Sequence, residues 1–152
     1  NPECAEFGRL AGEVRIGSQN DPDFLQAVVA EMGGVDIVLD DGSHVATHQR
    51  TSFEVLYPLL REGGLYVIED LHTSYWADYE GGLKRAGTAL EDLKDLIDRM
   101  HEHYFEQDRD EAKGMAPIGS ITFFDSIAAI EKRVQHPRRL AISPMPSSAP
   151  HA

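Results

Sequence analysis

The sequence is poor in cysteine, in basic residues and in long apolar runs, and each shortage excludes a class of protein. Cys4 is the single cysteine among 152 residues, so no disulfide forms within the chain and a reducing, cytoplasmic location is expected. Lys and Arg number 14 against 26 Asp and Glu, and the net charge of -12 disfavours binding to nucleic acid. No apolar stretch approaches the roughly 20 residues that cross a bilayer. We therefore expect neither a nucleic-acid partner nor a membrane partner.

What the sequence does have is the pattern of an α/β domain. With 41% hydrophobic residues, a chain of this length can bury a sizeable core. Apolar periodicity and turn residues predict strands and helices in alternation: strand 13–19, helix 21–34, strand 35–40, helix 47–60 and strand 65–70. This order predicts three parallel strands joined by right-handed helical crossovers.

The second half of the sequence predicts a long connection, an amphipathic helix and a terminal strand pair, at 71–87, 88–105 and 118–134. A tight turn near Asp125 and Ser126 joins the two last strands, which close the sheet with an antiparallel edge. Pro and Ser dominate residues 143–152, a composition typical of a flexible tail. Residues 1–142 are thus expected to form the domain.

Acidic residues follow two of the predicted parallel strands. "VLDDGSH" (38–44) ends in Asp40 and Asp41, and "YVIED" (66–70) ends in Glu69 and Asp70. One crossover joins these strands, so they are expected to be neighbours about 4.8 Å apart, with all four acids on one rim. Carboxylates at so short a distance repel one another unless a cation neutralises their charge. Oxygen ligands favour Mg²⁺, Mn²⁺ or Ca²⁺ over zinc, so the sequence predicts a divalent metal site.

His44 is the candidate base beside this site. Side chains alternate along a strand, so only one of Asp40 and Asp41 is expected to face the metal. With an unperturbed pKa of about 6.5, the imidazole of His44 suits removal of a proton near neutral pH. The simpler alternative is that the Asp-Asp pair is a solvated turn and that His44 caps a helix. His48 and His72 are alternative bases or surface groups.

The long connection holds three aromatic residues, Tyr75, Trp76 and Tyr79. They either stack on a sugar or aromatic substrate or pack a lid shut. Two other functions would use the same acids: metal-dependent hydrolysis of a phosphoester, and a magnesium-binding phosphoacceptor signalling module. The signalling module needs a lysine after a later strand, and Lys132, inside the last predicted strand, fits that role poorly.

"VDIVLDDGSHVATHQRTSFEVLYPLLREGGLYVIEDLHTSYW", with "SITFFDSIAAIEKR" further on, resembles the S-adenosylmethionine- and metal-dependent sugar O-methyltransferases of macrolide antibiotic biosynthesis, such as the mycinamicin and tylosin enzymes. The resemblance covers about residues 1–134 and implies a class I methyltransferase (Rossmann-like) sheet. It also implies that Mg²⁺ (or Mn²⁺) is held by Asp41, Glu69 and Asp70, that His44 is the general base, and that Asp40 lies on the cofactor side.

The same resemblance implies that part of the fold is missing. The glycine-rich loop that would bind the methionine part of the cofactor does not precede residue 13, so the sheet is expected to be incomplete. "GSQND" is expected to border the adenine, with Ser18, Gln19 and Asp21 as contacts. Tyr75 and Trp76 are the candidate substrate contacts, and the substrate is expected to be a glycoside or another vicinal diol. We expect the chain alone to methylate little, and the intact protein to be a homo-oligomer.

Overall fold

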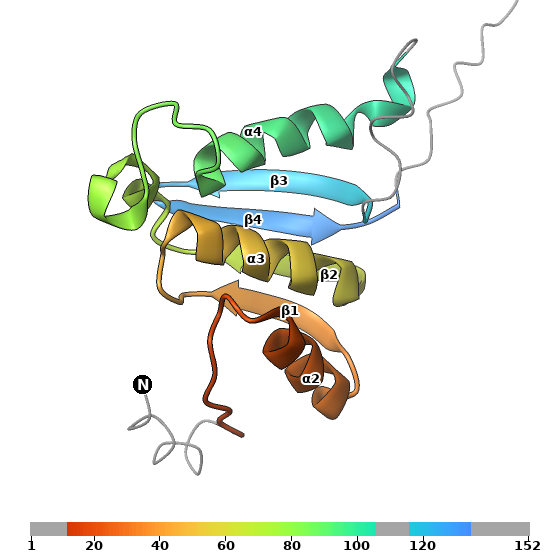
Figure 1. Cartoon of the computed structure of the whole chain (residues 1–152). Coiled ribbons are helices and arrows are strands. Elements are labelled where there is room, and N and C mark those ends of the chain that lie inside the picture. The colour runs from red at the N-terminus through yellow and green to blue at the C-terminus, as the bar shows by residue number, and fades with distance from the viewer. Residues whose placement is uncertain (1–11, 106–115, 135–152) are drawn as a thin grey trace, which may run out of the picture.

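The structure is a computed structural model that describes residues 12–105 and 116–134 (Figure 1). Its centre is a four-stranded sheet of order β1-β2-β4-β3. β1 (Val35–Asp40) and β2 (Leu60–Ile68) run parallel, as the helical crossover between them requires. β3 (Ile118–Phe124) and β4 (Ile127–Lys132) form an antiparallel hairpin, and β4 pairs antiparallel with β2. The predicted terminal hairpin is therefore confirmed.

Within residues 12–105 and 116–134, three α-helices accompany the sheet: α2 (Pro22–Met32), α3 (Ala46–Leu56) and α4 (Ala89–Met100). Asp21 caps α2, because its side chain accepts from the amides of Asp23 and Phe24. Thr88 caps α4 by accepting from the amide of Glu91. Short 3₁₀ turns fill the connections: η2 (Tyr57–Leu59), η3 (Leu71–Tyr75), η4 (Ala77–Tyr79) and η5 (Glu102–Tyr104). Among the described residues, no helix has the length and apolar character that crossing a bilayer requires.

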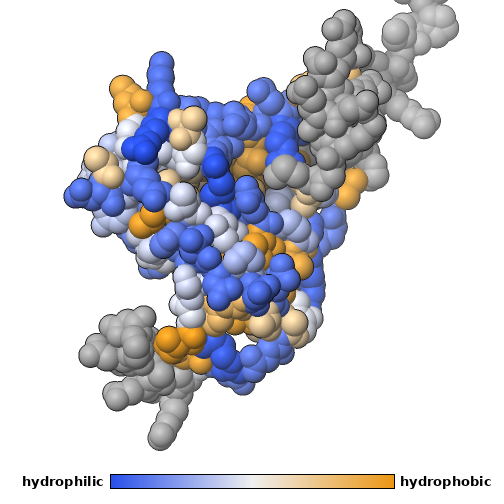
Figure 2. Space-filling view, viewed as in Figure 1, coloured by the Kyte–Doolittle hydropathy of each residue, from blue (hydrophilic) through white to orange (hydrophobic). Residues whose placement is uncertain are grey.

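The hydrophobic core lies between the sheet and the layer that contains α3 and α4 (Figure 1). Tyr66 and Ile68 of β2 lie opposite Ile130 and Ala128 of β4, and all four are buried. Leu93 and Leu96 of α4 pack onto them. Seen from the helix side, the surface is mainly hydrophilic, with apolar groups in the hollow between α3 and α4 (Figure 2).

The other face of the sheet is apolar and open. On β1, the side chains of Ile37 and Leu39 are 66% and 58% exposed, and they pair in register with Leu65 and Val67 of β2. On β3, Phe124 is also exposed. Within the described residues, no helix covers these positions, so the sheet is open on this side as well as at the β1 edge.

The predicted strand at 13–19 is wrong. Residues 13–17 follow an irregular course, and β1 pairs with β2 alone within the described ranges, so two parallel strands form where three were expected. A strand is stable only when a ladder partner satisfies its amides. Here Arg15 instead forms ion pairs with Glu13 and with Glu31 of α2, which ties the segment to a helix.

Other predicted boundaries shift for local reasons. The helix expected at 47–60 ends at Leu56 and tightens into η2, because Pro58 has no amide hydrogen and its ring clashes with a continuing helix. β2 begins at Leu60 rather than at residue 65, and Gly63 and Gly64 lie at an irregularity in its pairing with β1. α4 ends at Met100 rather than at residue 105. The predicted tail at 143–152 and the domain limit at residue 142 lie outside the described residues.

Candidate metal and base site

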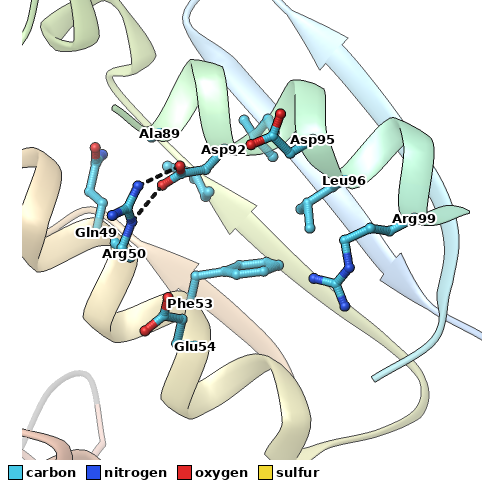
Figure 3. Close-up of a pocket in the computed structure, with 11 residues that line it drawn as sticks. Gln49, Arg50, Phe53, Glu54, Ala89, Asp92, Asp95, Leu96 and Arg99 are labelled. Atoms are coloured by element: carbon cyan, nitrogen blue, oxygen red, sulfur yellow. Dashed lines mark hydrogen bonds and ion pairs between the residues drawn. The ribbon is translucent and has the colours of Figure 1, made fainter. Parts of the chain in front are cut away.

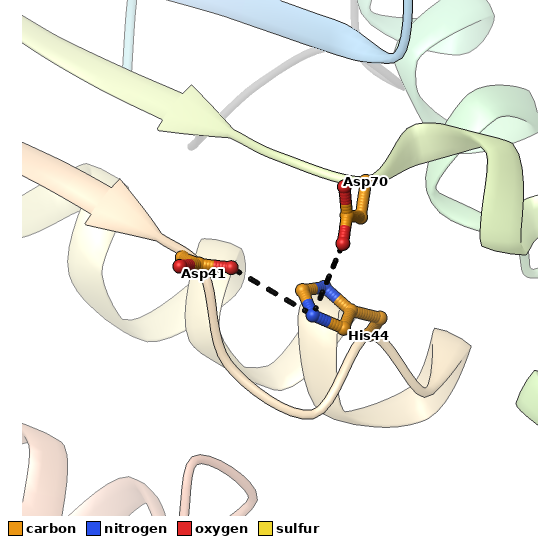
Figure 4. Close-up of side chains that lie close together, drawn as sticks. All are labelled: Asp41, His44 and Asp70. Carbon is orange, nitrogen blue, oxygen red and sulfur yellow. Dashed lines mark ion pairs between the residues drawn. The ribbon is translucent and has the colours of Figure 1, made fainter.

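Asp41, His44 and Asp70 come together where β1 and β2 end (Figure 4). One ligand atom from each lies within 4.8 Å of the others. His44 Nε2 is 3.7 Å from Asp41 Oδ1 and 3.5 Å from Asp70 Oδ2, which are distances for charge attraction rather than for short hydrogen bonds. The sequence predicted this juxtaposition from the parallel order of the two strands, whereas the roles of the three residues stay predictions.

The exposure of the three side chains differs. Those of Asp41 and Asp70 are 57% and 49% exposed, whereas that of His44 is 17% exposed. The ring atom Nδ1 of His44 is buried and has no hydrogen-bond partner among the described residues. The imidazole therefore directs Nε2 toward the two carboxylates and toward solvent.

The backbone at two of these residues is strained. His44 has φ 59° and Asp70 has φ 53°, both in the left-handed region that non-glycine residues occupy at a cost of about 1–3 kcal/mol each. The hydroxyl of Thr73, which is 2% exposed, lies 2.7 Å from the carbonyl oxygen of Asp70 and 3.3 Å from that of His44. Thr73 thus joins the two strained turns and keeps both side chains facing one point.

Asp40 turns away from this cluster, as the alternation of side chains along β1 requires. It is 5% exposed, and its carboxylate accepts hydrogen bonds from the hydroxyl of Tyr66, at 2.8 Å, and from the amide of Gln19. Burial raises the pKa of Asp40 above its usual value, and these two hydrogen bonds act in the opposite direction because they favour the charged form. Asp40 therefore anchors the end of β1 from inside.

Glu69, the third residue of the predicted ligand set, does not belong to the group of Asp41, His44 and Asp70, and its role as a ligand stays a prediction. Its amide donates to the carbonyl of Asp40 at 3.0 Å, which continues the pairing of β1 and β2 past the end of β2. Neighbouring residues on an extended chain point to opposite sides. The left-handed turn at Asp70 then swings that carboxylate alone toward His44.

The residues predicted to contact the adenine are engaged within the chain. Asp21 caps α2, and the hydroxyl of Ser18 accepts from the amide of Asn20 at 3.1 Å. The side-chain amide of Gln19 bonds to Asp40 and to Ser43. The predicted cofactor side of Asp40 is likewise occupied, by Gln19 and Tyr66.

The aromatic residues of the connection form a row that reaches His44. The ring of Tyr79 lies 6.5 Å from that of His44 and 6.0 Å from that of Trp76, and Trp76 meets His72 edge-on at 4.6 Å. Trp76 and Tyr75 are 51% and 53% exposed. Of the three aromatic residues considered from the sequence, Tyr79 is the one next to the imidazole.

The two alternative histidine bases have other partners. His48 Nδ1 is 2.7 Å from the hydroxyl of Ser43, and His72 Nδ1 is 2.6 Å from the hydroxyl of Ser126. Neither ring belongs to the cluster of Asp41, His44 and Asp70, although His72 Nδ1 also lies 4.0 Å from Asp70 Oδ1. His44 is therefore the histidine that the structure places between the two acids.

A pocket of about 250 Å³ lies apart from this cluster, between α3 and α4 (Figure 3). Its walls include Phe53, Leu93 and Leu96, and an ion pair between Arg50 and Asp92 crosses one end. Burial lowers the pKa of Arg99, which also lines it. None of the predicted site residues lines this pocket.

Sequence reasoning missed Tyr66 and Thr73, both of which hold the site from behind. Tyr66 alternates with the outward residues of β2, so its inward direction was readable, but its bond to Asp40 depends on the register of β1 against β2. Nothing in the sequence marks Thr73 as a site residue, because the carbonyl groups that its hydroxyl contacts belong to His44, 29 residues earlier, and to Asp70, three residues earlier.

Several curated relatives match the sequence, whereas no protein-family model does. The chain is 52% identical over 87 residues to L-olivosyl-oleandolide 3-O-methyltransferase of Streptomyces antibioticus, a match that covers 55% of this chain and 22% of that protein. It is 41% identical over 124 residues to demethylmacrocin O-methyltransferase of Streptomyces fradiae, a match that covers 78% of this chain and 31% of that protein. Mycinamicin VI 2''-O-methyltransferase of Micromonospora griseorubida is 40% identical over 129 residues, covering 79% and 32%.

Solved structures give the same result. The MycE methyltransferase of the mycinamycin pathway in complex with Mg and SAH superposes with a TM-score of 0.74 at 36% identity, over 91% of this chain and 36% of that one. A MycE complex with Mg, SAH and mycinamycin VI gives a TM-score of 0.71 at 38% identity, over 78% and 31%. The chain thus spans about a third or less of the proteins it matches. It is homologous to one part of the sugar O-methyltransferases of macrolide pathways and shares the fold of that part.

Proposed function

We propose that this chain is the metal-binding and acceptor-binding part of an S-adenosylmethionine-dependent O-methyltransferase that methylates one hydroxyl of a vicinal diol on a sugar or deoxysugar of a natural product. The observation that carries the proposal is the cluster of Asp41, His44 and Asp70 at adjacent strand ends. The relatives of this chain are named as methyltransferases, and MycE was solved with Mg, SAH and mycinamycin VI.

The donor set fits a hard divalent cation. Asp41 and Asp70 offer carboxylate oxygens from two strands, and their half-exposed positions leave room for water or for substrate hydroxyls, which Mg²⁺ retains among its ligands. Glu69 is a third candidate ligand from the sequence. When bound, Mg²⁺ would supply a Lewis acid that lowers the pKa of a substrate hydroxyl.

His44 is proposed to take the proton of that hydroxyl through Nε2. Nε2 lies within 3.7 Å of an oxygen of each carboxylate, so the imidazole stands beside the proposed metal position. General base catalysis of this kind contributes about 10²–10⁴-fold to the rate. The strained turns at His44 and Asp70 support this role, because strain of this kind gathers at functional sites.

The aromatic row of Tyr79 and Trp76 is proposed to contact the apolar face of the sugar, and the exposed ring of Tyr75 is a further candidate contact. Ser18, Gln19, Asp21 and Asp40 were predicted on the cofactor side. Their internal bonds favour a supporting role there over direct contact. Because the chain spans about a third of its relatives, we propose that it methylates little by itself. We also propose that the intact enzyme is a homo-oligomer, since the sheet is open at the β1 edge and exposes Ile37 and Leu39.

Binding of Mn²⁺, a paramagnetic substitute for Mg²⁺, tests the metal site directly. We expect Asp41→Asn and Asp70→Asn each to weaken Mn²⁺ binding at least tenfold in an electron paramagnetic resonance titration, because each removes a charged ligand. Asp23→Asn, an exposed substitution in the first turn of α2, is the matched control and should bind as the parent does. Equal affinity in all four proteins would refute a metal site at these residues.

Calorimetric titration with S-adenosylmethionine separates methyl transfer from the rival hydrolase and signalling functions. In a protein that binds this cofactor, His44→Asn should suppress methyl transfer while cofactor affinity is retained. Asn also tolerates the left-handed backbone that this position requires. Loss of cofactor affinity together with activity would indicate a structural role for His44 instead.

A further inference from the structure

The side chain of Gln19 reaches both flanks of the loop that carries the candidate metal ligand Asp41. Its Oε1 accepts from the backbone amide of Ser43 at 2.8 Å and lies 3.2 Å from the hydroxyl of the same residue. Its Nε2 donates to Oδ1 of Asp40. One amide group therefore holds the residue before Asp41 and the residue before His44.

The fit of this amide against the loop is close. A Cβ atom added at Gly42 would overlap the side-chain amide of Gln19, so only glycine leaves room for it there. The hydroxyl of Ser43 also contacts Nδ1 of His48 at 2.7 Å, and this contact ties the loop to the first turn of α3. The far side of Asp40 is fixed by the hydroxyl of Tyr66.

Gln19 itself is held by its own surroundings. Its backbone carbonyl lies 3.4 Å from the hydroxyl of Ser52, which is buried on α3. The bonds of its side chain use the carbonyl oxygen and one of the two N–H groups. With both its backbone and its side chain hydrogen-bonded, Gln19 connects the segment before α2 to the end of β1.

We propose that Gln19 is a positioning residue that fixes residues 40–43 so that Asp41 and His44 face Asp70, and that metal affinity depends on it although it contacts no metal. This inference rests on the proposed metal function of the cluster. Groups that orient metal ligands from behind typically contribute 10–100-fold to metal affinity, because a ligand that is free to turn must be ordered when the metal binds. Gln19 would supply that order in advance.

The first test compares Gln19→Ala with Gln26→Ala in the 152-residue chain. Gln26 is an exposed glutamine on α2, so it controls for loss of the same side chain. We expect Gln19→Ala to weaken Mn²⁺ binding about 10–100-fold and Gln26→Ala to leave it unchanged. Circular dichroism and thermal unfolding are recorded for each variant. A lower unfolding temperature with unaltered Mn²⁺ affinity would assign Gln19 a structural role alone and overturn the proposal.

The second test exchanges donor and acceptor between the two partners. Gln19→Glu places a carboxylate against Asp40 and should weaken Mn²⁺ binding as the alanine variant does. In Gln19→Glu/Asp40→Asn, the new asparagine amide can donate to the new glutamate, its carbonyl can accept from Tyr66, and the net charge is that of the parent. We expect this pair to restore the affinity to within about threefold of the parent. A double variant as weak as Gln19→Glu would count against the proposal, including when Gln19→Ala fails to fold.

The two proposals fail in different ways. If Asp41→Asn abolishes Mn²⁺ binding and no Gln19 variant changes it, the metal function stands and the positioning role is wrong. If Asp41→Asn also leaves binding unchanged, the metal function itself is wrong and the positioning role falls with it.

Discussion

Tyr66→Phe removes one hydroxyl from the centre of the protein and tests how a buried charge is held. Tyr66 is fully buried, and its hydroxyl donates at 2.8 Å to the carboxylate of Asp40, which is 5% exposed. No water can replace the lost donor without entering the core. A hydrogen bond to a charged group contributes about 1.5–3 kcal/mol, so the free energy of unfolding at pH 7 should fall by that amount.

The loss should shrink at acidic pH. Burial already raises the pKa of Asp40, and removing a donor that favours its charged form raises this pKa further. Between the unfolded and folded pKa values the folded state then binds more protons than the unfolded state, so stability falls as pH rises through that interval. Once Asp40 is protonated, the bond is a neutral one worth about 0.5–1.5 kcal/mol. A gap of about 1.4 kcal/mol between the two limits corresponds to about one pKa unit.

Tyr57→Phe is the matched control. Tyr57 is also buried, but its hydroxyl lies near two neutral groups, 3.0 Å from the carbonyl of Pro117 and 3.2 Å from that of Glu131. Its loss should cost about 0.5–1.5 kcal/mol and should not depend on pH in the acid range. Urea denaturation of both variants and the parent at a series of pH values gives the comparison. Equal, pH-independent losses for the two variants would refute the reasoning that Asp40 is charged and held by Tyr66.

Three further predictions concern other parts of the fold. Thr73→Val should lower the unfolding free energy by about 1–2 kcal/mol and weaken Mn²⁺ binding, because it frees the turns at Asp70 and His44; unchanged calorimetric Mn²⁺ titrations would contradict this. Asp21→Ala should cost about 1 kcal/mol in urea denaturation by removing the cap of α2, with no change in Mn²⁺ affinity. Leu39→Lys should reduce self-association in analytical ultracentrifugation, since it places a charge on the open apolar face; identical sedimentation of the parent would argue against association through that face.

The part of the site that sequence reasoning could predict is the part that strand geometry fixes. Two strands joined by one helical crossover are expected to be parallel neighbours, so the acids after them were expected to share an edge. The alternation along β1 also required Asp40 and Asp41 to face opposite ways, although the sequence left open which of the two faced the site. The structure places Asp40 inside and Asp41 outside.

What sequence reasoning could not predict depends on contacts between distant segments or on single backbone angles. The sequence at 13–19 has the pattern of a strand, yet a strand also needs a neighbour, and pattern alone cannot show whether the neighbour is present. In the sequence, Glu69 and Asp70 are two adjacent acidic residues that are equally plausible members of the site. The left-handed angle at Asp70 separates them, and no propensity favours that angle strongly enough to be read in advance.

The left-handed turns at His44 and Asp70 set the requirements of activity against those of stability. Glycine or asparagine at either position would relax the backbone by roughly 1 kcal/mol or more. Under the proposed function, directed evolution for heat resistance without a screen for metal binding should therefore enrich those replacements and yield more stable proteins that bind Mn²⁺ weakly. Positions 44 and 70 are the ones to hold constant in any consensus design or thermostabilisation of this chain.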